Sequence, residues 1–472
     1  MATSEAVDVL VIGGGISGLT TAFTIAEASP LRVAIAEAGE QWGGSIVSQS
    51  NEAGFLWELG PNSFTPNTAL LELVERLGLS ERLIWADAKL PRFVFWGDRL
   101  HAVPSSPPAL LKTELLSLAG KLRAIRGAMG FVAPAMTEHE SVASFFRRHL
   151  GQEVVERLVA PFVSGVYAGD PEQLGVSAAF SKVFQLEREY GGLLAGFLLS
   201  RKAQSKTQSQ VPTKFKLGQL GSLRGGLQVL PQAIAQKLSQ TSAHLYQQWR
   251  CQKLSYSADS QTYKAQFATP DGTAEIQSRS VVLATPAYAC AEILRHFCPL
   301  ASEILASIDY PPVACVALAY PASSLRFPLK GFGNLIPRGQ GIRTLGTIWA
   351  SSLFPDRAPA GWQLLLNFIG GATDPQIAHL SPEEIVHAVD QDLRQILLQP
   401  DTTSAPQVLA VKLWQKAIPQ YGLDHVAKME NLQKAIARLP NLYLCGNYSD
   451  GVALGDCIRR GMALGKRLAQ LK

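Results

Sequence analysis

The stretch VDVLVIGGGISGL (residues 7–19) decides the fold of this chain. Val7 to Ile12 is apolar except for Asp8, which predicts a buried strand, and glycines follow it at once. Leu19 to Ala28 is compatible with a helix, and Leu31 to Ala36 is a second short apolar run. Together these elements predict a strand–helix–strand unit at the start of an α/β fold.

Three glycines of this stretch form the pattern G-x-G-x-x-G between the predicted strand and the predicted helix. Gly13 permits the tight turn, Gly15 lets the backbone approach a pyrophosphate, and Gly18 lets helix and strand pack closely. The helix N-terminus adds N–H groups and positive potential. Glu37, which closes the second strand, would accept hydrogen bonds from ribose hydroxyls and repel a 2′-phosphate, so an adenosine dinucleotide without that phosphate is expected.

Further glycines after Glu37 favour FAD over NAD as this dinucleotide. Gly43 and Gly44 follow Glu37 closely, and the segment Gly60-Pro61-Asn62-Ser63 comes next. These positions match the extended pattern of glutathione-reductase-like FAD proteins.

Length and composition set the frame for these motifs. The chain has 472 residues, of which 47% are hydrophobic, so it is long enough for two or three domains. A net charge of +5 is too weak a bias to argue for a nucleic-acid partner. The six cysteines are scattered without metal-ligand spacing, which predicts free thiols and no metal site. We expect no signal or transit peptide before the first strand and no run long and apolar enough to span a bilayer.

The middle of the chain changes in character. From about Leu90 to Ser200 apolar residues recur at helical spacing, which predicts an amphipathic helical insertion. Residues 201–216 are basic and polar, which predicts a mobile surface loop. Three apolar runs then predict an antiparallel meander, namely Leu245–Leu254, Thr262–Phe267 and Ala274–Ala284. More strands are expected between Val313 and Ile369, and a last strand at Leu442–Cys445 precedes a helix that begins at about Asp456.

Five segments give the chain a more specific resemblance. They are VIGGGISGL (11–19), GPNS (60–63), HESVASFFRRHLGQEVVERLVAPFVSGVYAGDP (139–171), LGTIWASSLFPDRAP (345–359) and CGNYSDGVALGDCIRRG (445–461). With these segments the chain resembles the oxygen-dependent protoporphyrinogen oxidases over nearly its whole length. One departure is Ser45, where many flavin amine oxidases and desaturases have arginine.

The resemblance implies an organisation in three parts and a set of cofactor residues. A discontinuous Rossmann-like FAD-binding domain would comprise residues 1–89, 215–300 and 430–472, with a helical insertion at 90–214 and a mixed-sheet substrate domain at 301–429. The FAD contacts that it implies are Gly13, Gly14, Gly15, Ile16, Ser17, Gly18, Glu37, Ala38, Gly44, Ser45, Gly60, Pro61, Asn62, Ser63, Cys251, Val452, Ala453 and Leu454. Cys251 would contribute through its backbone, and the helix after Leu454 could stabilise negative charge on the reduced flavin.

The same resemblance implies a porphyrinogen substrate, a large apolar macrocycle that carries propionates. Such a molecule needs a wide hydrophobic cavity with one or two cationic anchors. Arg92 matches the position that pairs with a propionate, and a guanidinium can hold a carboxylate through two bonds. The other implied substrate contacts are Leu335, Ile348 and Phe368, which would sandwich the macrocycle, and Gly165 and Gly169 in a tight turn that lines the cavity. No histidine stands in a motif that indicates a general base, so the cofactor would carry the chemistry, with O2 as the acceptor.

Alternatives from two classes remain open at this point. A flavin amine oxidase or a carotenoid desaturase would share the fold, although the loop GVALGD lacks the aromatic residue that amine oxidases place there. A binding protein of the Rab GDP-dissociation-inhibitor type would share the fold without flavin, against which the intact glycines and Glu37 argue.

The location of the protein is a further expectation. Lys112, Lys121, Arg123 and Arg126 accompany the leucines of the helical insertion, which favours peripheral attachment to the cytoplasmic face of a membrane. A homodimer is one of the assemblies that the sequence leaves open.

Overall fold

A computed structural model describes residues 4–133, 139–193, 196 and 219–470 of the chain, so the loop expected at 201–216 lies outside the described residues. The expected strand–helix–strand unit is confirmed, as β1 (Ser4–Ile12), α1 (Ile16–Ala28) and β2 (Val33–Ala36). β1 is a central strand, parallel to β2 on one side and to β12 (Gly272–Leu283) on the other. The order of this first sheet is β10-β11-β12-β1-β2-β9, and β18 (Leu442–Leu444) also pairs with β12.

The expected meander is confirmed with one correction. β10 (Arg250–Ser257), β11 (Thr262–Thr269) and β12 are antiparallel neighbours. The run Leu245–Leu254, however, is not a single strand. It is divided between β9 (His244–Tyr246), which pairs with β2, and β10, and Gln248 between them has a left-handed backbone with φ 61°.

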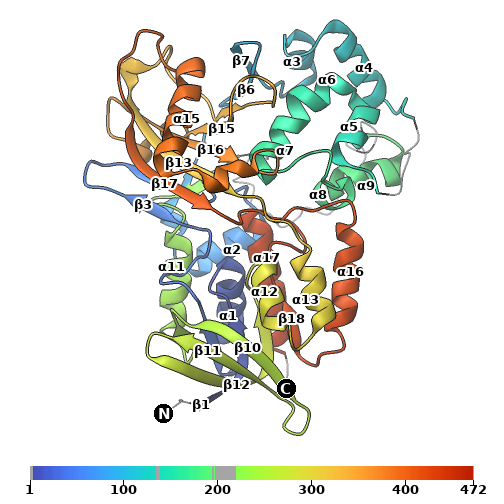
Figure 1. Cartoon of the computed structure of the whole chain (residues 1–472), viewed down its shortest axis with the longest axis vertical. Helices are drawn as coiled ribbons and strands as arrows, with labels where there is room; N and C mark the ends of the chain where they lie inside the picture. Colours follow the sequence, from blue (N-terminus) through green and yellow to red (C-terminus); the bar gives the residue numbers. More distant parts are fainter. Residues whose placement is uncertain (1–3, 134–138, 194–195, 197–218, 471–472) are drawn as a thin grey trace.

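A second sheet has the order β17-β13-β16-β15-β14-β6-β7 and lies at the upper left of Figure 1. Its strands are β6 (Arg92–Trp96), β7 (Arg99–Ala102), β13 (Val313–Pro321), β14 (Gly333–Leu335), β15 (Thr344–Trp349), β16 (Trp362–Gly370) and β17 (Gln407–Trp414). The prediction of helix from Leu90 onwards is therefore wrong for residues 92–102. β6 is a strand because it pairs in parallel with β14, a partner that is distant in the sequence.

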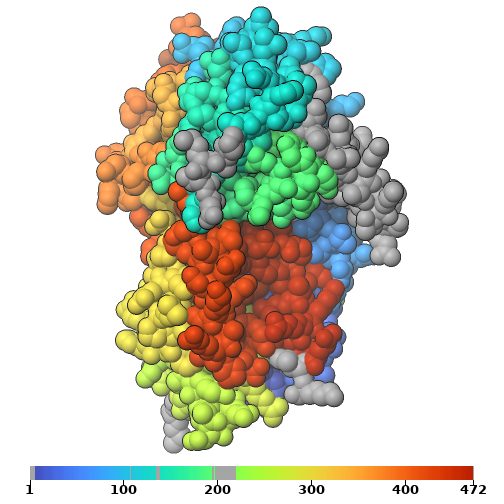
Figure 2. All heavy atoms as spheres, turned by 90° about the vertical axis from the view of Figure 1, so that its right-hand side faces the viewer, coloured from blue at the N-terminus to red at the C-terminus, as the bar shows by residue number. Residues whose placement is uncertain are grey.

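Within the segment predicted to be helical, the helices begin only after β7. They form a third region at the upper right of Figure 1. They are α3 (Pro107–Lys112), α4 (Leu118–Ala128), α5 (Val142–Leu150), α6 (Gln152–Val154), a π-helical turn η2 (Val155–Val159), α7 (Ala160–Tyr167), α8 (Val176–Ala179) and α9 (Ser181–Tyr190). Pro161 lacks an N–H group, which accounts for the irregular turn before α7. Figure 2 shows this helical region covering the upper part of one face of the molecule.

The remaining elements pack around the two sheets. The helices are α2 (Thr68–Arg76), α11 (Val229–Leu238), α12 (Ala287–Leu294), α13 (Pro299–Ala306), α14 (Ala350–Leu353), α15 (Pro382–Ile396), α16 (His425–Ile436) and α17 (Leu454–Leu468). Short strands are β3 (Ser48–Ser50), β4 (Leu56–Glu58), β5 (Leu83–Trp85) and β8 (Gly221–Leu223). Single 3₁₀ turns are η1 (Ser80–Arg82), η3 (Ala322–Ser324), η4 (Pro355–Arg357) and η5 (Pro375–His379). Among the described residues, no helix combines the length and the hydropathy that crossing a bilayer requires.

Candidate active site

The glycine-rich turn after β1 has the geometry of a nucleotide-binding loop. Gly13 has a φ of 113°, which only glycine adopts readily, and a Cβ on it would lie 2.8 Å from the backbone of Ala284. A Cβ on Gly15 would meet nothing within 4 Å, so the space in front of the first turn of α1 is open. N–H groups of a helix terminus facing open space can bind a phosphate anion.

The predicted acidic residue stands at this turn. One carboxylate oxygen of Glu37 accepts a hydrogen bond from the backbone N–H of Gly14 at 2.6 Å, and the other accepts one from Gly39 at 2.7 Å. A carboxylate has further lone pairs, so Glu37 can still accept from ribose hydroxyls. The N–H of Trp249 bonds to the carbonyl of Glu37 at 2.8 Å, which brings Cys251 to the same end of the sheet. Burial raises the pKa of the Cys251 thiol to about 12, so that side chain stays protonated and inert.

Two more predicted segments adjoin the turn. Gly44 has a φ of 61°, and a Cβ on it would lie 3.3 Å from Cα of Gly15. A Cβ on Gly60 would collide with the carbonyl oxygen of Ser45, so these two loops touch through their backbones. Asn62, which follows closely, is 5% exposed, and neither its amide nitrogen nor its amide oxygen has a partner among the described residues. A buried amide without partners is costly unless a ligand satisfies it.

The start of the last helix completes this arrangement. α17 begins at Leu454 rather than at Asp456, so Val452 and Ala453 lead directly into its first turn. α17 runs parallel to α1 in close contact, because a Cβ on Gly461 would lie 2.8 Å from the carbonyl of Ser17 and one on Gly465 would lie 2.9 Å from that of Thr21. The two helix dipoles therefore point in the same direction, but the N-terminus of α17 extends about 9 Å beyond that of α1, because Gly461 follows Leu454 by seven residues whereas Ser17 follows Ile16 by one. Together with the open space at Gly15 and the unpartnered Asn62, this fits an anionic dinucleotide such as FAD.

The predicted substrate residues share one face of the second sheet. Across β6, β14 and β15, Arg92 pairs with Gly333 and Gly333 with Ile348. Across β14, β15 and β16, Leu335 pairs with Gly346 and Gly346 with Phe368. Paired residues and residues two apart point to the same face, so Arg92, Leu335, Ile348 and Phe368 lie on one side.

Helix α7 faces this side of the sheet. A Cβ on Gly165 would collide with Cδ2 of Leu335, so two of the predicted substrate residues touch. Gly165 lies within the helix, however, and not in a tight turn; the helix ends at Ala168, which has a φ of 50°. Gly169 is buried, and its Cβ position faces Gln420 and Leu174 rather than the sheet.

Two residues of this region escaped the sequence reasoning. Phe162 and Val166 are 44% and 42% exposed and lie one turn apart on α7, where Phe162 precedes Gly165 by three residues and Val166 follows it directly. The spacing of four residues between Phe162 and Val166, which puts them on one helix face, is the signal that could have identified them. They would supply apolar contact area opposite Leu335.

Arg92 lies at the rim of the sheet face rather than at its centre. Its guanidinium carbon is 5.1 Å from the centre of the Phe332 ring, the side chain is exposed, and no described carboxylate forms an ion pair with it. The hollow that it lines measures only about 20 Å³, far less than a macrocycle needs. An unpaired cation at the rim can bind a propionate that extends from a ring lying over the sheet face.

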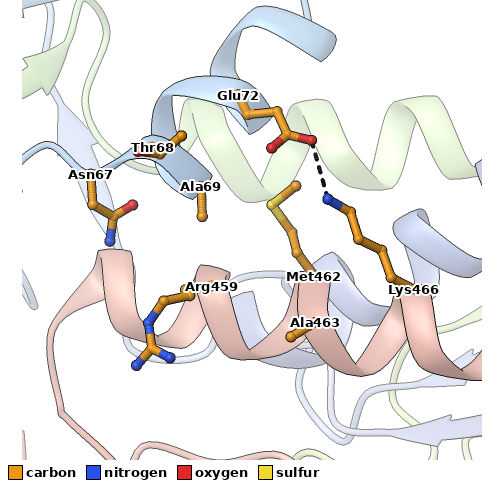
Figure 3. Close-up of a pocket in the computed structure, with 8 residues that line it drawn as sticks. All are labelled: Asn67, Thr68, Ala69, Glu72, Arg459, Met462, Ala463 and Lys466. Carbon is orange, nitrogen blue, oxygen red and sulfur yellow. Dashed lines mark ion pairs between the residues drawn. The ribbon is translucent and has the colours of Figure 1, made fainter. Parts of the chain in front are cut away.

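A larger groove lies elsewhere, between α2 and α17 (Figure 3). It measures about 380 Å³, and Glu72, Arg459, Met462 and Lys466 are among its lining residues. Lys466 already pairs with Glu72 at 3.6 Å. None of the predicted site residues lines this groove, so we do not assign it to the reaction.

Comparisons with known proteins show the family and the fold of the chain. The family of flavin containing amine oxidoreductases matches residues 16–464. A chloroplastic protoporphyrinogen oxidase of Oryza sativa is 42% identical over 96% of this chain and 86% of its own length. A coproporphyrinogen III oxidase of Bacillus subtilis is 32% identical over 96% of both chains. A solved Exiguobacterium structure, assigned as a protoporphyrinogen oxidase, superposes with a TM-score of 0.80 over 99% of both chains at 23% identity, which shows the same fold.

Proposed function

The chain belongs to the flavin-containing amine oxidoreductase family, and from this premise we infer that it is an FAD-dependent protoporphyrinogen oxidase of porphyrin biosynthesis. The 42% identity to a plant protoporphyrinogen oxidase over nearly the whole chain carries this conclusion. The site supports it, because an apolar sheet face lies in the same molecule as a nucleotide-binding turn, and Arg92 at the rim of that face forms no ion pair with a described carboxylate.

When bound, FAD supplies the acceptor for hydride removed from a methylene bridge of the porphyrinogen, and three such oxidations with O2 as final acceptor give the porphyrin and H2O2. The protein's own residues bind and orient the substrate. Arg92 would hold a propionate, and Leu335, Ile348 and Phe368 would lie against one face of the macrocycle. Helix α7, whose Gly165 contacts Leu335 directly, would border the macrocycle at its edge, where the exposed Phe162 and Val166 would help to exclude water.

The amine oxidase alternative is weakened by Tyr448. This is the aromatic residue closest to the loop where amine oxidases build an aromatic cage. Tyr448 is fully buried in a core cluster beside the first sheet, and its hydroxyl lies 3.7 Å from the Cys290 thiol. It therefore cannot line a substrate cavity without unfolding its surroundings.

A turnover panel tests the proposed activity. The purified protein should show the visible absorbance of oxidised flavin and should oxidise protoporphyrinogen with release of H2O2. The same assay with coproporphyrinogen, which carries more propionates, and with primary amines separates the rival substrates. Faster turnover of an amine than of either porphyrinogen would overturn the assignment.

We further propose that the helical region attaches the protein peripherally to a membrane on its cytoplasmic side. Its apolar side chains divide into two sets. Leu115 and Leu116 are buried in the region's own core. The second set, which we call the apolar edge, is 56–75% exposed and consists of Leu111, Leu118, Leu122, Met129 and Phe131. Isolated exposed apolar residues need no explanation, but a cluster of five large ones does.

The basic residues of this region do not all support attachment equally. Lys112 and Arg126 are exposed beside the apolar edge. Lys121 donates a hydrogen bond to the carbonyl of Leu111 at 2.9 Å. Arg123 points into the protein, where it donates to the carbonyls of Arg148 and His149 at the end of α5. The expectation that four cations face the membrane is thus wrong for Arg123, whose role is to cap a helix.

Co-sedimentation with anionic vesicles tests the attachment. Leu118→Ser/Leu122→Ser and Lys112→Glu/Arg126→Glu should each lower the bound fraction, and salt should lower it for the parent protein, since each surface cation contributes about 1 kcal/mol. Leu300→Ser is a matched control, because Leu300 is 52% exposed on α13, outside the apolar edge. Equal binding by all variants, or none by the parent protein, would contradict the proposal.

A further inference from the structure

A buried ion pair joins the short strand β4 to the turn η4. Glu58 on β4 and Arg357 on η4 are both 1% exposed, and their closest atoms, Oε1 and Nη2, are 3.6 Å apart. The Glu58 carboxylate also accepts hydrogen bonds from the Ser48 hydroxyl and from the N–H of Leu227. It is therefore well satisfied without a close contact to Arg357.

Arg357 is much less satisfied. Its Nη2 donates to the hydroxyl of Ser222 at 2.7 Å, whereas Nε and Nη1 have no hydrogen-bond partner among the described residues. The nearest other carboxylate, Asp356, is 3.9 Å from Nε. Burying a guanidinium with unpartnered N–H groups is unfavourable. A gain in folding stability therefore does not account for this ion pair.

The two partners of Arg357 flank one loop, since Glu58 precedes it in the sequence and Ser222 lies on β8, the strand that bonds to the residue after it. Glu58 stands two positions before Gly60. Ser222 follows Gly221, whose N–H and carbonyl both bond to Phe64 at 2.9 Å, directly after Ser63. Arg357 thus spans the loop Gly60–Ser63, which contains the buried and unpartnered Asn62.

The same pair reaches the second nucleotide loop. Ser48, which bonds to Glu58, accepts from the N–H of Gln228 at 2.9 Å, and the Gln228 side chain donates to the carbonyl of Trp42 at 2.6 Å. Trp42 precedes Gly43 and Gly44. On the other side, Arg357 follows β15, the strand that carries Ile348, by way of α14.

We propose that Arg357 is a positioning residue for the oxidation, because it holds both ends of the loop Gly60–Ser63 and aligns that loop with the strand of Ile348. The proposal rests on the proposed function for the identity of the reaction only. Its effect on the loop is independent of the substrate.

The decisive variant is Arg357→Met/Glu58→Gln, which removes both charges with little change in volume. Replacing a buried ion pair by neutral groups of similar size is often neutral or stabilising, so we expect an unchanged or higher Tm. We expect the affinity of the apoprotein for FAD, measured by quenching of flavin fluorescence, to fall about tenfold, as for one lost hydrogen bond. At saturating FAD, kcat per bound flavin should fall about 10- to 100-fold, because a small misplacement of the flavin relative to the substrate slows the reaction. The KM for the porphyrinogen should change little.

Two further variants keep the test decisive. Arg357→Lys retains the positive charge but lacks the planar guanidinium. Its FAD affinity and its kcat per flavin should lie between those of the parent protein and the double variant, which matters if the double variant folds poorly. Arg148→Lys is the control, because Arg148 is a buried arginine of the helical region; it should lower Tm and leave FAD affinity and kcat alone. If FAD affinity or kcat per flavin of the Arg357 variants equals that of the parent protein, Arg357 is structural only. If the parent protein oxidises no porphyrinogen, the proposed function fails, while the FAD titration still decides the role of Arg357.

Discussion

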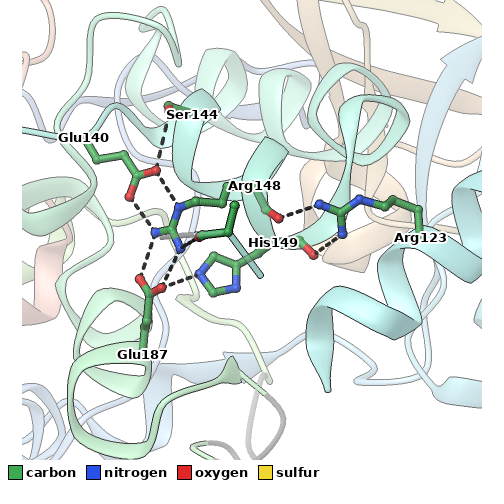
Figure 4. A network of polar contacts seen from close by, with 7 residues as sticks. Arg123, Glu140, Ser144, Arg148, His149 and Glu187 are labelled. Carbon is green, nitrogen blue, oxygen red and sulfur yellow. Dashed lines mark hydrogen bonds and ion pairs between the residues drawn. The ribbon is translucent and has the colours of Figure 1, made fainter. Parts of the chain in front are cut away.

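Two buried arginines in different regions are satisfied to very different degrees. Arg148 on α5 is 8% exposed, and all three of its guanidinium nitrogens donate hydrogen bonds, to Glu140, Glu187 and the carbonyl of Ala133 (Figure 4). These bonds, above all those with Glu140, raise the pKa of Arg148. Arg357 is buried more deeply but uses only one of its nitrogens.

The difference separates two uses of a buried charge. The Arg148 network joins α5, α9 and residues around 133 and 140, so it stabilises the helical region itself. An arginine with unpartnered N–H groups adds little stability, which makes a role in positioning the better explanation for Arg357. Completeness of hydrogen bonding, rather than burial alone, therefore distinguishes a structural ion pair from a functional one.

The largest effect that follows concerns Arg148→Met. The substitution leaves Glu140, which is 4% exposed, without its cation, and breaking a buried pair in this way costs about 3–5 kcal/mol. Chemical denaturation should show this loss, and the folded fraction should keep its activity per flavin. Arg147→Met is the control: Arg147 pairs with Glu172 on the surface, where both side chains are more than 40% exposed, so its loss should cost at most about 1 kcal/mol. Equal losses of unfolding free energy in the two variants would contradict the structural role assigned to Arg148.

A structural feature of this molecule could be predicted when the residues that determine it lie close together in the sequence. The unit from β1 to β2 was predictable because apolar periodicity and glycine spacing lie within thirty or so residues. β6 was not, because it becomes a strand only by pairing with β14. The separation of β9 from β10 depends on the left-handed conformation of Gln248, a residue type that gives no strong turn signal.

The candidate site divides in the same way. The nucleotide loops carry local glycine patterns and could be located directly. Arg92, Leu335, Ile348 and Phe368 came from family resemblance, and the sheet register places them on one face. No local pattern predicts the pairing of Glu58 with Arg357, because these residues are distant in the sequence and meet only in the folded chain.

Arg92 extends the comparison to an exposed arginine without an ion pair. Arg92→Ala should raise KM for the porphyrinogen about 10- to 150-fold, equivalent to the 1.5–3 kcal/mol of a charge-assisted hydrogen bond, and should change kcat less. Tm should not fall, because no described carboxylate loses a partner. An unchanged KM would place Arg92 outside the substrate site and leave the propionate without its anchor.

Lowering the pH should change the unfolding free energy in opposite directions through the Arg148 network and through Glu58. The bond to Arg148 holds the pKa of Glu187 below its ordinary value of 4.5, and burial holds that of His149 below 6.5. Both groups stabilise the folded state above their unfolded pKa values, and that stability is lost as pH falls through 6.5 and then below 4.5. Burial instead raises the pKa of Glu58, whose contribution is present at low pH and is lost as pH rises through its folded pKa.

Glu187→Gln measures this difference. At neutral pH it should lower the unfolding free energy by about 1 kcal/mol, since Glu187 is partly exposed, and the loss should vanish below the folded pKa of Glu187. Glu58→Gln should show no such loss at neutral pH. Unfolding followed from pH 7 to acid conditions checks both variants, and parallel curves would contradict the assignment of the two pairs to different roles.

The smallest expected effect is an absence of pH dependence in kcat. His425 is 3% exposed, its ring stacks on Tyr421 with centroids 4.3 Å apart, and burial lowers its pKa to about 4. His425 therefore stays uncharged between about pH 6 and 9, and burial favours the neutral form of His149, so kcat should be flat across that range if positioning rather than proton transfer is the protein's contribution. A bell-shaped profile would show that an ionising group takes part. His425→Gln would then test the buried histidine whose Nε2 has no partner among the described residues, and a bell that persisted in this variant would come from another group. If the bell disappeared in that variant, an incompletely bonded histidine would join Arg357 as a functional group, and the comparison would hold for proton transfer as well as for positioning.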